Sequence, residues 1–136
     1  MTDYVLDTSA LLALFKDEEG AQEVEEILDT CKGGKSKVYL PFMSIMEFDY
    51  QVLRSRGRTA VDGALRMIQA WPIETVESNP EWGRKAAWVK SRAGLSVADA
   101  WNAALALLLG AELVHKDPEF DQVHSLKHRR LPYKKT

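Results

Sequence analysis

Four acidic residues, far apart in the sequence, stand where predicted strands end or predicted helices begin. Asp7 and Asp117 each follow a short apolar run that predicts a buried strand. Glu47 and Asp99 lie near the starts of two predicted helices. In an open parallel sheet the carboxyl ends of the strands share one edge, and the helices that follow them begin near it. We therefore expect the four carboxylates to converge.

Converging carboxylates repel one another, which raises their pKa values unless a positive charge neutralises them. A divalent cation that prefers oxygen ligands, Mg²⁺ or Mn²⁺, is the usual solution. Such an ion activates a water molecule and stabilises the negative charge that builds on a phosphate. Asp7, Glu47, Asp99 and Asp117 are therefore the candidate metal ligands and catalytic residues of such a site.

Each acid also has a purely structural explanation. Glu47 and Asp99 each follow a serine by three residues, which fits a capping box at the start of a helix. Asp117 precedes a proline and fits an N-cap, and Asp7 fits an N-cap for the helix behind it. Taken singly each alternative stays open, whereas the shared edge favours a common site.

Strand-like and helical patterns alternate along the chain. The strands are predicted at residues 4–7, 38–40, 72–76 and 113–117, with a short fifth strand near residue 131. The helices are predicted at residues 10–15, 21–31, 44–56, 61–68, 80–93 and 96–109, with a short one opening at residue 117. This alternation implies a parallel, doubly wound α/β sheet. The length of 136 residues predicts one domain spanning 1–136.

Composition limits the function classes. With 46% hydrophobic residues the chain can build one core, and a net charge of −2 excludes a strongly basic coat protein for nucleic acid. The single cysteine, Cys31, allows no internal disulfide and lies on an apolar helical stripe, so we expect it in the core. No leader-like segment opens the sequence and no apolar run is long enough to cross a bilayer, which predicts a soluble cytoplasmic protein with no membrane partner.

Four motifs carry a family resemblance, in order: residues 5–12 (VLDTSALL), 44–47 (SIME), 95–100 (LSVADA, followed by two alanines at 103–104) and 113–120 (LVHKDPEF). They resemble the PIN-domain family, and within it the small VapC-type ribonuclease toxins of toxin–antitoxin pairs. The resemblance covers nearly the whole chain. It implies a three-layer α/β/α fold with a central parallel sheet of four or five strands. It also implies endonuclease activity on RNA that depends on Mg²⁺ or Mn²⁺.

By position, the four acids match the acidic residues of that family, and Thr8 and Ser9 match its hydroxyl positions. His115 stands where the family often has Thr or Ser. Alternation along a strand would point its side chain the same way as that of Asp117. There it would act as a proton shuttle, contact the substrate or lie at the rim of the site without a role. Asn102 lies one turn after Asp99, where it would hold a metal-bound water or substrate, or form part of the polar surface.

The resemblance also implies partners: an RNA substrate, a second copy in a homodimer, and an antitoxin whose tail enters the acidic site. The acidic region of residues 17–29 would attract a basic partner segment. The RNA backbone would be held by Lys116 and by the basic tail, with further cations on the helix before Asp99; the tail residues are Lys127, Arg129, Arg130, Lys134 and Lys135. The four tryptophans would stack on bases or, as their apolar stripes favour, pack in the core or a dimer interface.

Other classes remain as alternatives. One is a PIN-like module that binds RNA or protein without catalysis. Another is a phosphohydrolase of a different α/β class, but the haloacid-dehalogenase type needs a second acid where this chain has Ser9. A phospho-acceptor receiver domain has no role for an acid on a helix at the position of Glu47. The glycine-rich nucleotide-binding loops are absent from the sequence.

Overall fold

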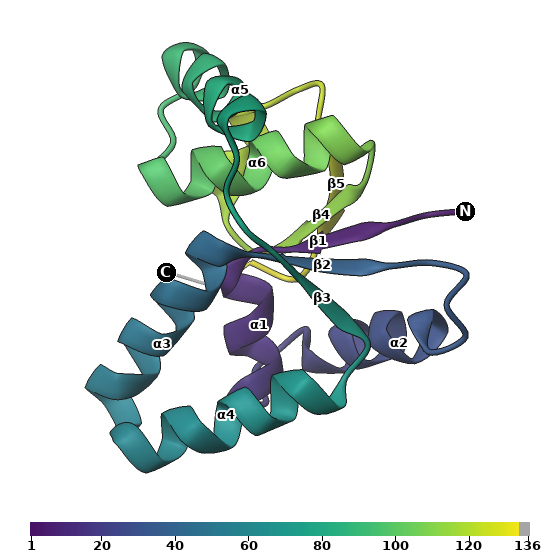
Figure 1. The fold of residues 1–136 in the computed structure, drawn as a ribbon, viewed down its shortest axis with the longest axis vertical. Helices are drawn as coiled ribbons and strands as arrows, with labels where there is room; N and C mark the ends of the chain where they lie inside the picture. Colours follow the sequence, from purple (N-terminus) through teal and green to yellow (C-terminus); the bar gives the residue numbers. More distant parts are fainter. Residues whose placement is uncertain (134–136) are drawn as a thin grey trace.

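The computed structural model describes residues 1–133, which contain a five-stranded sheet (Figure 1). All strand pairs are parallel and the order across the sheet is β3-β2-β1-β4-β5. The strands are β1 (Tyr4–Leu6), β2 (Val38–Pro41), β3 (Ile73–Val76), β4 (Glu112–His115) and β5 (Lys127–Arg130). The predicted fifth strand is therefore present, ending one residue before Leu131.

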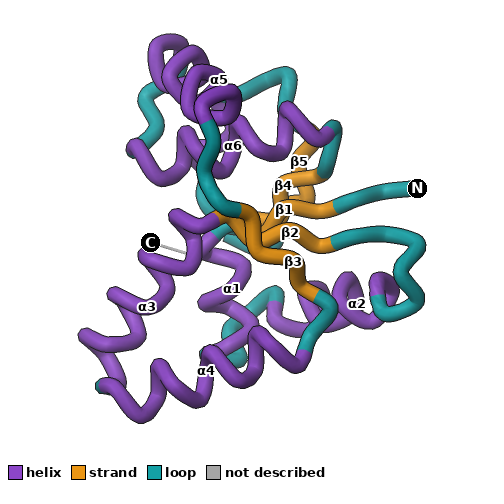
Figure 2. Tube along the Cα trace, viewed as in Figure 1, coloured by secondary structure: helices purple, strands orange, loops and turns teal. Residues whose placement is uncertain are grey.

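Helices cover both faces of the sheet and make three layers, as expected for this fold class (Figures 1 and 2). One layer holds α1 (Thr8–Phe15), α2 (Ala21–Cys31), α3 (Phe42–Arg56) and α4 (Arg58–Ala70). The other holds α5 (Pro80–Arg92) and α6 (Val97–Leu109), and a short 3₁₀ helix, η1 (Pro118–Gln122), follows β4. None of the helices within residues 1–133 is long and apolar enough to span a membrane.

Each face of the sheet buries its own hydrophobic cluster. Leu6 belongs to the cluster beneath α1–α4, and its neighbour Val5 belongs to the cluster beneath α5 and α6. Successive side chains on a strand point to opposite faces, so β1 serves both clusters with fully buried residues. Cys31 packs in the first cluster, as its helical spacing predicts.

The strand order creates a crevice beside β1. From β1 the chain adds β2 and β3 on one side, and after α5 and α6 it returns to add β4 and β5 on the other. Leu6 pairs with Val114 in register, and the Asp7 amide donates to the Val114 carbonyl at 3.0 Å. The carboxyl ends of β1 and β4 therefore flank a topological switch point, where open α/β sheets place their sites.

Candidate functional site

A cleft of about 470 Å³ opens at this switch point. Its lining includes all four predicted acids, Asp7, Glu47, Asp99 and Asp117, together with the predicted hydroxyl residues Thr8 and Ser9 and the cations Lys16 and Lys116. The structure thus brings together acids that lie up to 110 residues apart in sequence, from Asp7 to Asp117.

Asp7 is held by donors from two elements. It follows β1 directly and caps α1, accepting from the Ser9 amide at 3.0 Å and from the Ser9 hydroxyl. From α6, Asn102 Nδ2 donates to Asp7 Oδ1 at 2.8 Å and to Ser44 Oγ at 2.9 Å. Asn102 is fully buried, so it is no surface residue, and it fixes the orientation of the Asp7 carboxylate.

Ser9 joins the ends of the two central strands. Its hydroxyl proton is donated to Asp7, and its oxygen accepts the backbone N–H of Lys116 at 3.1 Å. One side chain therefore couples the carboxylate after β1 to the backbone after β4.

Glu47 faces the cleft from the second turn of α3. The predicted capping box is wrong, because α3 begins at Phe42 with Pro41 as its N-cap, and the buried Ser44 hydroxyl bonds instead to the Leu6 carbonyl at 3.3 Å. Glu47 accepts the Thr8 hydroxyl at 2.7 Å. The Thr8 hydroxyl, and not a helix N-terminus, therefore positions the Glu47 carboxylate.

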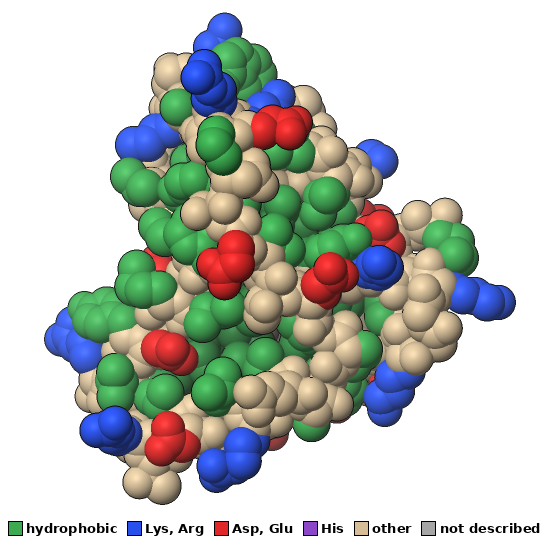
Figure 3. Space-filling view, viewed as in Figure 1, with side chains coloured by type: hydrophobic (Ala, Val, Ile, Leu, Met, Phe, Trp, Pro, Cys, Tyr) green, Lys and Arg blue, Asp and Glu red, His purple; other side chains and the backbone are tan. Residues whose placement is uncertain are grey.

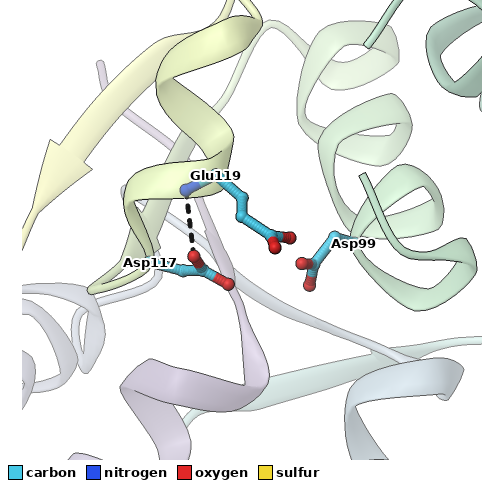
Figure 4. A group of neighbouring side chains, drawn as sticks. All are labelled: Asp99, Asp117 and Glu119. Carbon is cyan, nitrogen blue, oxygen red and sulfur yellow. Dashed lines mark hydrogen bonds between the residues drawn. The ribbon is translucent and has the colours of Figure 1, made fainter. Parts of the chain in front are cut away.

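Asp99 and Asp117 take part in helix capping and also line the cleft. Ser96 caps α6 by accepting from the Asp99 amide at 3.2 Å, and Asp117 caps η1 by accepting from the Glu119 amide at 2.9 Å. Ligand oxygens of Asp99, Asp117 and Glu119 all lie within 4.8 Å of one another (Figure 4). Glu119 was not predicted as a site residue; its only signal is its place two residues after Asp117, which the η1 turn brings back toward the site.

Burial and mutual repulsion raise the pKa values of three of these acids. Burial, and then the charges of Asp7, Asp117 and Glu47, raises the pKa of Asp99 to about 8. Burial also raises the pKa of Asp7, although its hydrogen bonds from Ser9 and Asn102 oppose this, and it raises the pKa of Glu47. The protein has concentrated carboxylates where their charged forms are disfavoured.

The donor set suits a hard divalent cation. Within residues 1–133, none of the ion pairs involves Asp7, Glu47, Asp99, Asp117 or Glu119. The buried amide oxygen of Asn102, in the same cluster, accepts no hydrogen bond from these residues. Every candidate ligand atom is a carboxylate oxygen, which Mg²⁺ and Mn²⁺ prefer and Zn²⁺ sites rarely use alone.

His115 supports the site from behind. β4 ends at His115, so strand alternation does not extend to Asp117, and His115 is fully buried rather than at the rim. Its Nδ1 accepts the Asp117 amide at 3.2 Å, and its Nε2 lies 3.0 Å from His128 Nδ1. His128 Nε2 lies 3.2 Å from the Val123 carbonyl, which can only accept, so His128 carries its proton on Nε2. His128 Nδ1 then accepts from His115 Nε2, which places the His115 proton on Nε2 and leaves its Nδ1 free to accept.

The resulting chain runs from the Asp117 N–H through His115 and His128 to Val123, with both rings neutral. Burial, followed by the neighbouring His128, lowers the pKa of His115 to about 4, consistent with this arrangement. His115 therefore positions the backbone that presents Asp117. His128, its partner, carried no sequence signal.

The predicted RNA-binding cations occupy different places. Lys116 lines the cleft and donates from Nζ to the Glu19 carbonyl at 2.8 Å. Arg130 pairs with Asp121 at 2.9 Å, whereas Arg129 is exposed on β5. Lys127 donates to the Gly110 carbonyl. Lys134 and Lys135 lie outside the described residues.

We expect Asn102→Leu to lower the free energy of unfolding by about 1–3 kcal/mol, because it removes donors to a buried carboxylate and a buried hydroxyl. Chemical denaturation measures this. Ser55→Ala is the matched control, since its exposed bond to Gln51 should contribute less than about 0.5 kcal/mol. Equal midpoints for the two variants would refute a structural role for the amide.

Together the fold and cleft define a three-layer α/β/α domain with a carboxylate-built site at its switch point. The sequence matches the PIN domain over residues 4–126, and the chain belongs to this family. A search of curated proteins gave no significant match.

Solved structures with the same fold include toxin–antitoxin proteins. VapBC2 from Rickettsia felis, bound to promoter DNA, aligns with a TM-score of 0.80 at 13% identity, covering 96% of this chain and 100% of that one. VapBC-1 from Haemophilus influenzae aligns with a TM-score of 0.69 at 20% identity, covering 95% of this chain and 98% of that one. VapC20 from Mycobacterium tuberculosis, a toxin that cleaves the sarcin–ricin loop, gives 0.68 at 16%, covering 88% and 94%. At these identities the likeness concerns the fold.

Proposed function

We propose that the protein is a divalent-metal-dependent endoribonuclease and the toxin of a type II toxin–antitoxin pair. The observation that carries this is the convergence of Asp7, Glu47, Asp99 and Asp117 on one cleft with no cation paired to them within residues 1–133. PIN domains are nucleases as a family, and this chain has the acidic cluster that such chemistry needs.

Asp99, Asp117 and Glu119 would hold the Mg²⁺ or Mn²⁺ ion most directly, with Asp7 and Glu47 completing the negative cleft. When bound, the ion supplies Lewis acidity and a water of lowered pKa for attack on a phosphodiester. The protein's own contribution is orientation: Asn102 and Ser9 fix Asp7, Thr8 fixes Glu47, and the His115–His128 pair fixes the segment that carries Asp117.

The Asp99 carboxyl also holds a proton. With a pKa of about 8 it is mostly protonated at neutral pH in the metal-free protein. Cation binding requires the carboxylate, so binding releases this proton and strengthens as pH rises. The same proton limits repulsion among the acids before the ion arrives.

Incubation of purified protein with total cellular RNA, with Mn²⁺ or with EDTA, tests the proposal. New RNA ends should appear at defined positions with Mn²⁺, disappear with EDTA and return when excess Mn²⁺ is added. Full cleavage in EDTA after dialysis would exclude the metal mechanism. No cleavage of any RNA by stable, metal-loaded protein would favour the alternative of a silent binding module.

The proposal includes a protein partner. Several structural neighbours are complexes of a toxin with its antitoxin, some of them on DNA. We propose that a basic antitoxin segment occupies the acidic cleft, drawn by the acidic region of residues 17–29, whose Glu18 lines the cleft.

We also propose a homodimer. Three large apolar side chains of α3, Met46, Tyr50 and Leu53, are about half exposed and recur at helical spacing. Exposed apolar patches of this kind mark interaction surfaces.

We expect Leu53→Asp to convert the dimer to a monomer, because it would bury an unpaired charge in the interface. Sedimentation at micromolar concentration measures the change. Leu109→Asp makes the same substitution at an exposed position on α6 and should leave the dimer intact. A parent protein that sediments as a monomer would exclude the dimer.

A further inference from the structure

A second pocket lies between α5 and the segment after η1. Its volume of about 340 Å³ is within the range of small-ligand sites. Val89, Ala93 and Val123 give it apolar walls, and its polar groups come from Arg92, Gln122, His124 and Ser125. Among the described residues no carboxylate lines this pocket, in contrast to the acidic cleft.

Trp88 forms one wall and leaves 45% of its surface exposed. The tryptophans are predicted to pack in the core or in a dimer interface. Trp82 does pack in the core, where it contacts Trp101 and Phe42 edge to face, whereas Trp88 lies outside the core. Lys85 Nζ lies 4.3 Å and Arg92 Cζ 4.5 Å from the centroid of the Trp88 ring. An exposed indole flanked by cations is the combination that binds single-stranded nucleic acid, by base stacking and phosphate contacts.

The surrounding surface is basic. α5 carries four cations, Arg84, Lys85, Lys90 and Arg92, against one acid, Glu81, although the whole chain has a net charge of −2. Lysine and arginine side chains gather at the end of the molecule where α5 lies (Figure 3). This placement suits a polyanion that the acidic cleft itself would repel.

The pocket is linked physically to the acidic site. Gln122 Oε1 accepts the Gly94 amide at 2.8 Å, and its Nε2 donates to the Glu119 carbonyl at 3.1 Å. A Cβ at Gly94 would stand 3.3 Å from the Gln122 oxygen, so glycine permits this close approach. η1 spans five residues, a rise of about 10 Å, and separates the pocket from Asp117, so one RNA strand can reach both.

We propose that this pocket binds single-stranded RNA, with one base stacked against Trp88 and adjacent phosphates held by Lys85 and Arg92. Lys85, a flexible point charge, leaves the ring for a phosphate when the base stacks. The substrate class rests on the proposed function. The pocket supplies what a cleft of carboxylates lacks, a place that attracts the strand and keeps it beside the acids.

Binding of a 5′-fluorescein-labelled 12-nucleotide oligouridylate to the full chain in EDTA tests the pocket without cleavage. We expect Trp88→Ala to weaken binding about tenfold and to abolish quenching of tryptophan fluorescence, and Trp88→Phe to retain most of the affinity. Arg92→Ala should weaken binding and flatten its salt dependence. Lys32→Ala is the matched control, because it removes an equal charge that also lies over an indole, that of Trp71.

Several results would overturn the pocket: no binding by the parent, parent-like binding by folded Trp88→Ala, or equal losses in Arg92→Ala and Lys32→Ala. Loss of a protein partner with unchanged RNA binding in Trp88→Ala would assign the pocket to that partner instead. Trp88-dependent RNA binding without cleavage in Mn²⁺ would uphold the pocket and refute the nuclease. RNA cleavage together with RNA binding that does not depend on Trp88 would support the nuclease and refute the pocket.

Discussion

Asp99→Asn should reduce Mn²⁺-dependent RNA cleavage at least about a thousandfold, the equivalent of roughly 4 kcal/mol, while leaving the fold intact. Asp99 faces Asp117 and Glu119 across less than 4.8 Å, so it is the carboxylate from α6 that completes the group. The amide has nearly the same shape and keeps the backbone N–H that donates to Ser96. Single-turnover cleavage of a labelled RNA at saturating Mn²⁺ measures the loss.

Asp62→Asn is the matched control, because it makes the same chemical change at an exposed position on α4. It should cleave at the parent's rate. Cleavage by Asp99→Asn within about tenfold of the parent would remove Asp99 from the catalytic group.

Stability without metal should fall as pH rises from about 4 to about 8. An unfolded chain releases the Asp99 proton near its usual pKa of 3.8, whereas the folded protein holds it to about 8. Above pH 4 the unfolded state therefore binds fewer protons than the folded state, and stability decreases with pH until both have released them. The raised pKa values of Asp7 and Glu47 act in the same direction.

Asp99→Asn should flatten this pH dependence and raise the melting temperature of the metal-free protein at pH 8. Mn²⁺ at about 100 times its Kd should stabilise the parent by about 2.7 kcal/mol, a rise on the order of 10 °C. At one fixed Mn²⁺ concentration the rise should be larger at pH 8 than at pH 6, because at pH 8 more of the Asp99 carboxyl is already ionised and the ion binds more tightly. Melting curves with Mn²⁺ or EDTA at both pH values test this, and an Mn²⁺ effect equal in parent and variant would contradict it.

The convergence of the four acids was predictable because it follows from topology. Asp7 and Asp117 follow the ends of β1 and β4, which share an edge in any parallel arrangement, and α6 must begin near that edge. The local explanation for Glu47 failed because capping depends on where a helix starts. Pro41 and Phe42 move the start of α3 upstream, which frees Ser44 to bond to Leu6.

Other features depend on contacts that sequence spacing does not encode. Glu119 joins the site because η1 turns back on Asp117, and His128 reaches His115 only because β5 pairs beside β4. Trp88 sits in an apolar helical pattern but lies on its exposed side, since Trp82 and Val89 take the buried positions. The sequence pattern alone does not distinguish the exposed Trp88 from the buried Trp82, whereas the packed structure does.

Anomalous diffraction from crystals soaked in Mn²⁺ tests the metal site most directly. A peak is expected in the cleft among Asp99, Asp117 and Glu119, about 2 Å from carboxylate oxygens of at least two of them. It should be absent from crystals of Asp99→Asn under the same conditions. An empty cleft at an Mn²⁺ concentration that supports RNA cleavage in solution would contradict the assignment of these carboxylates as the metal site.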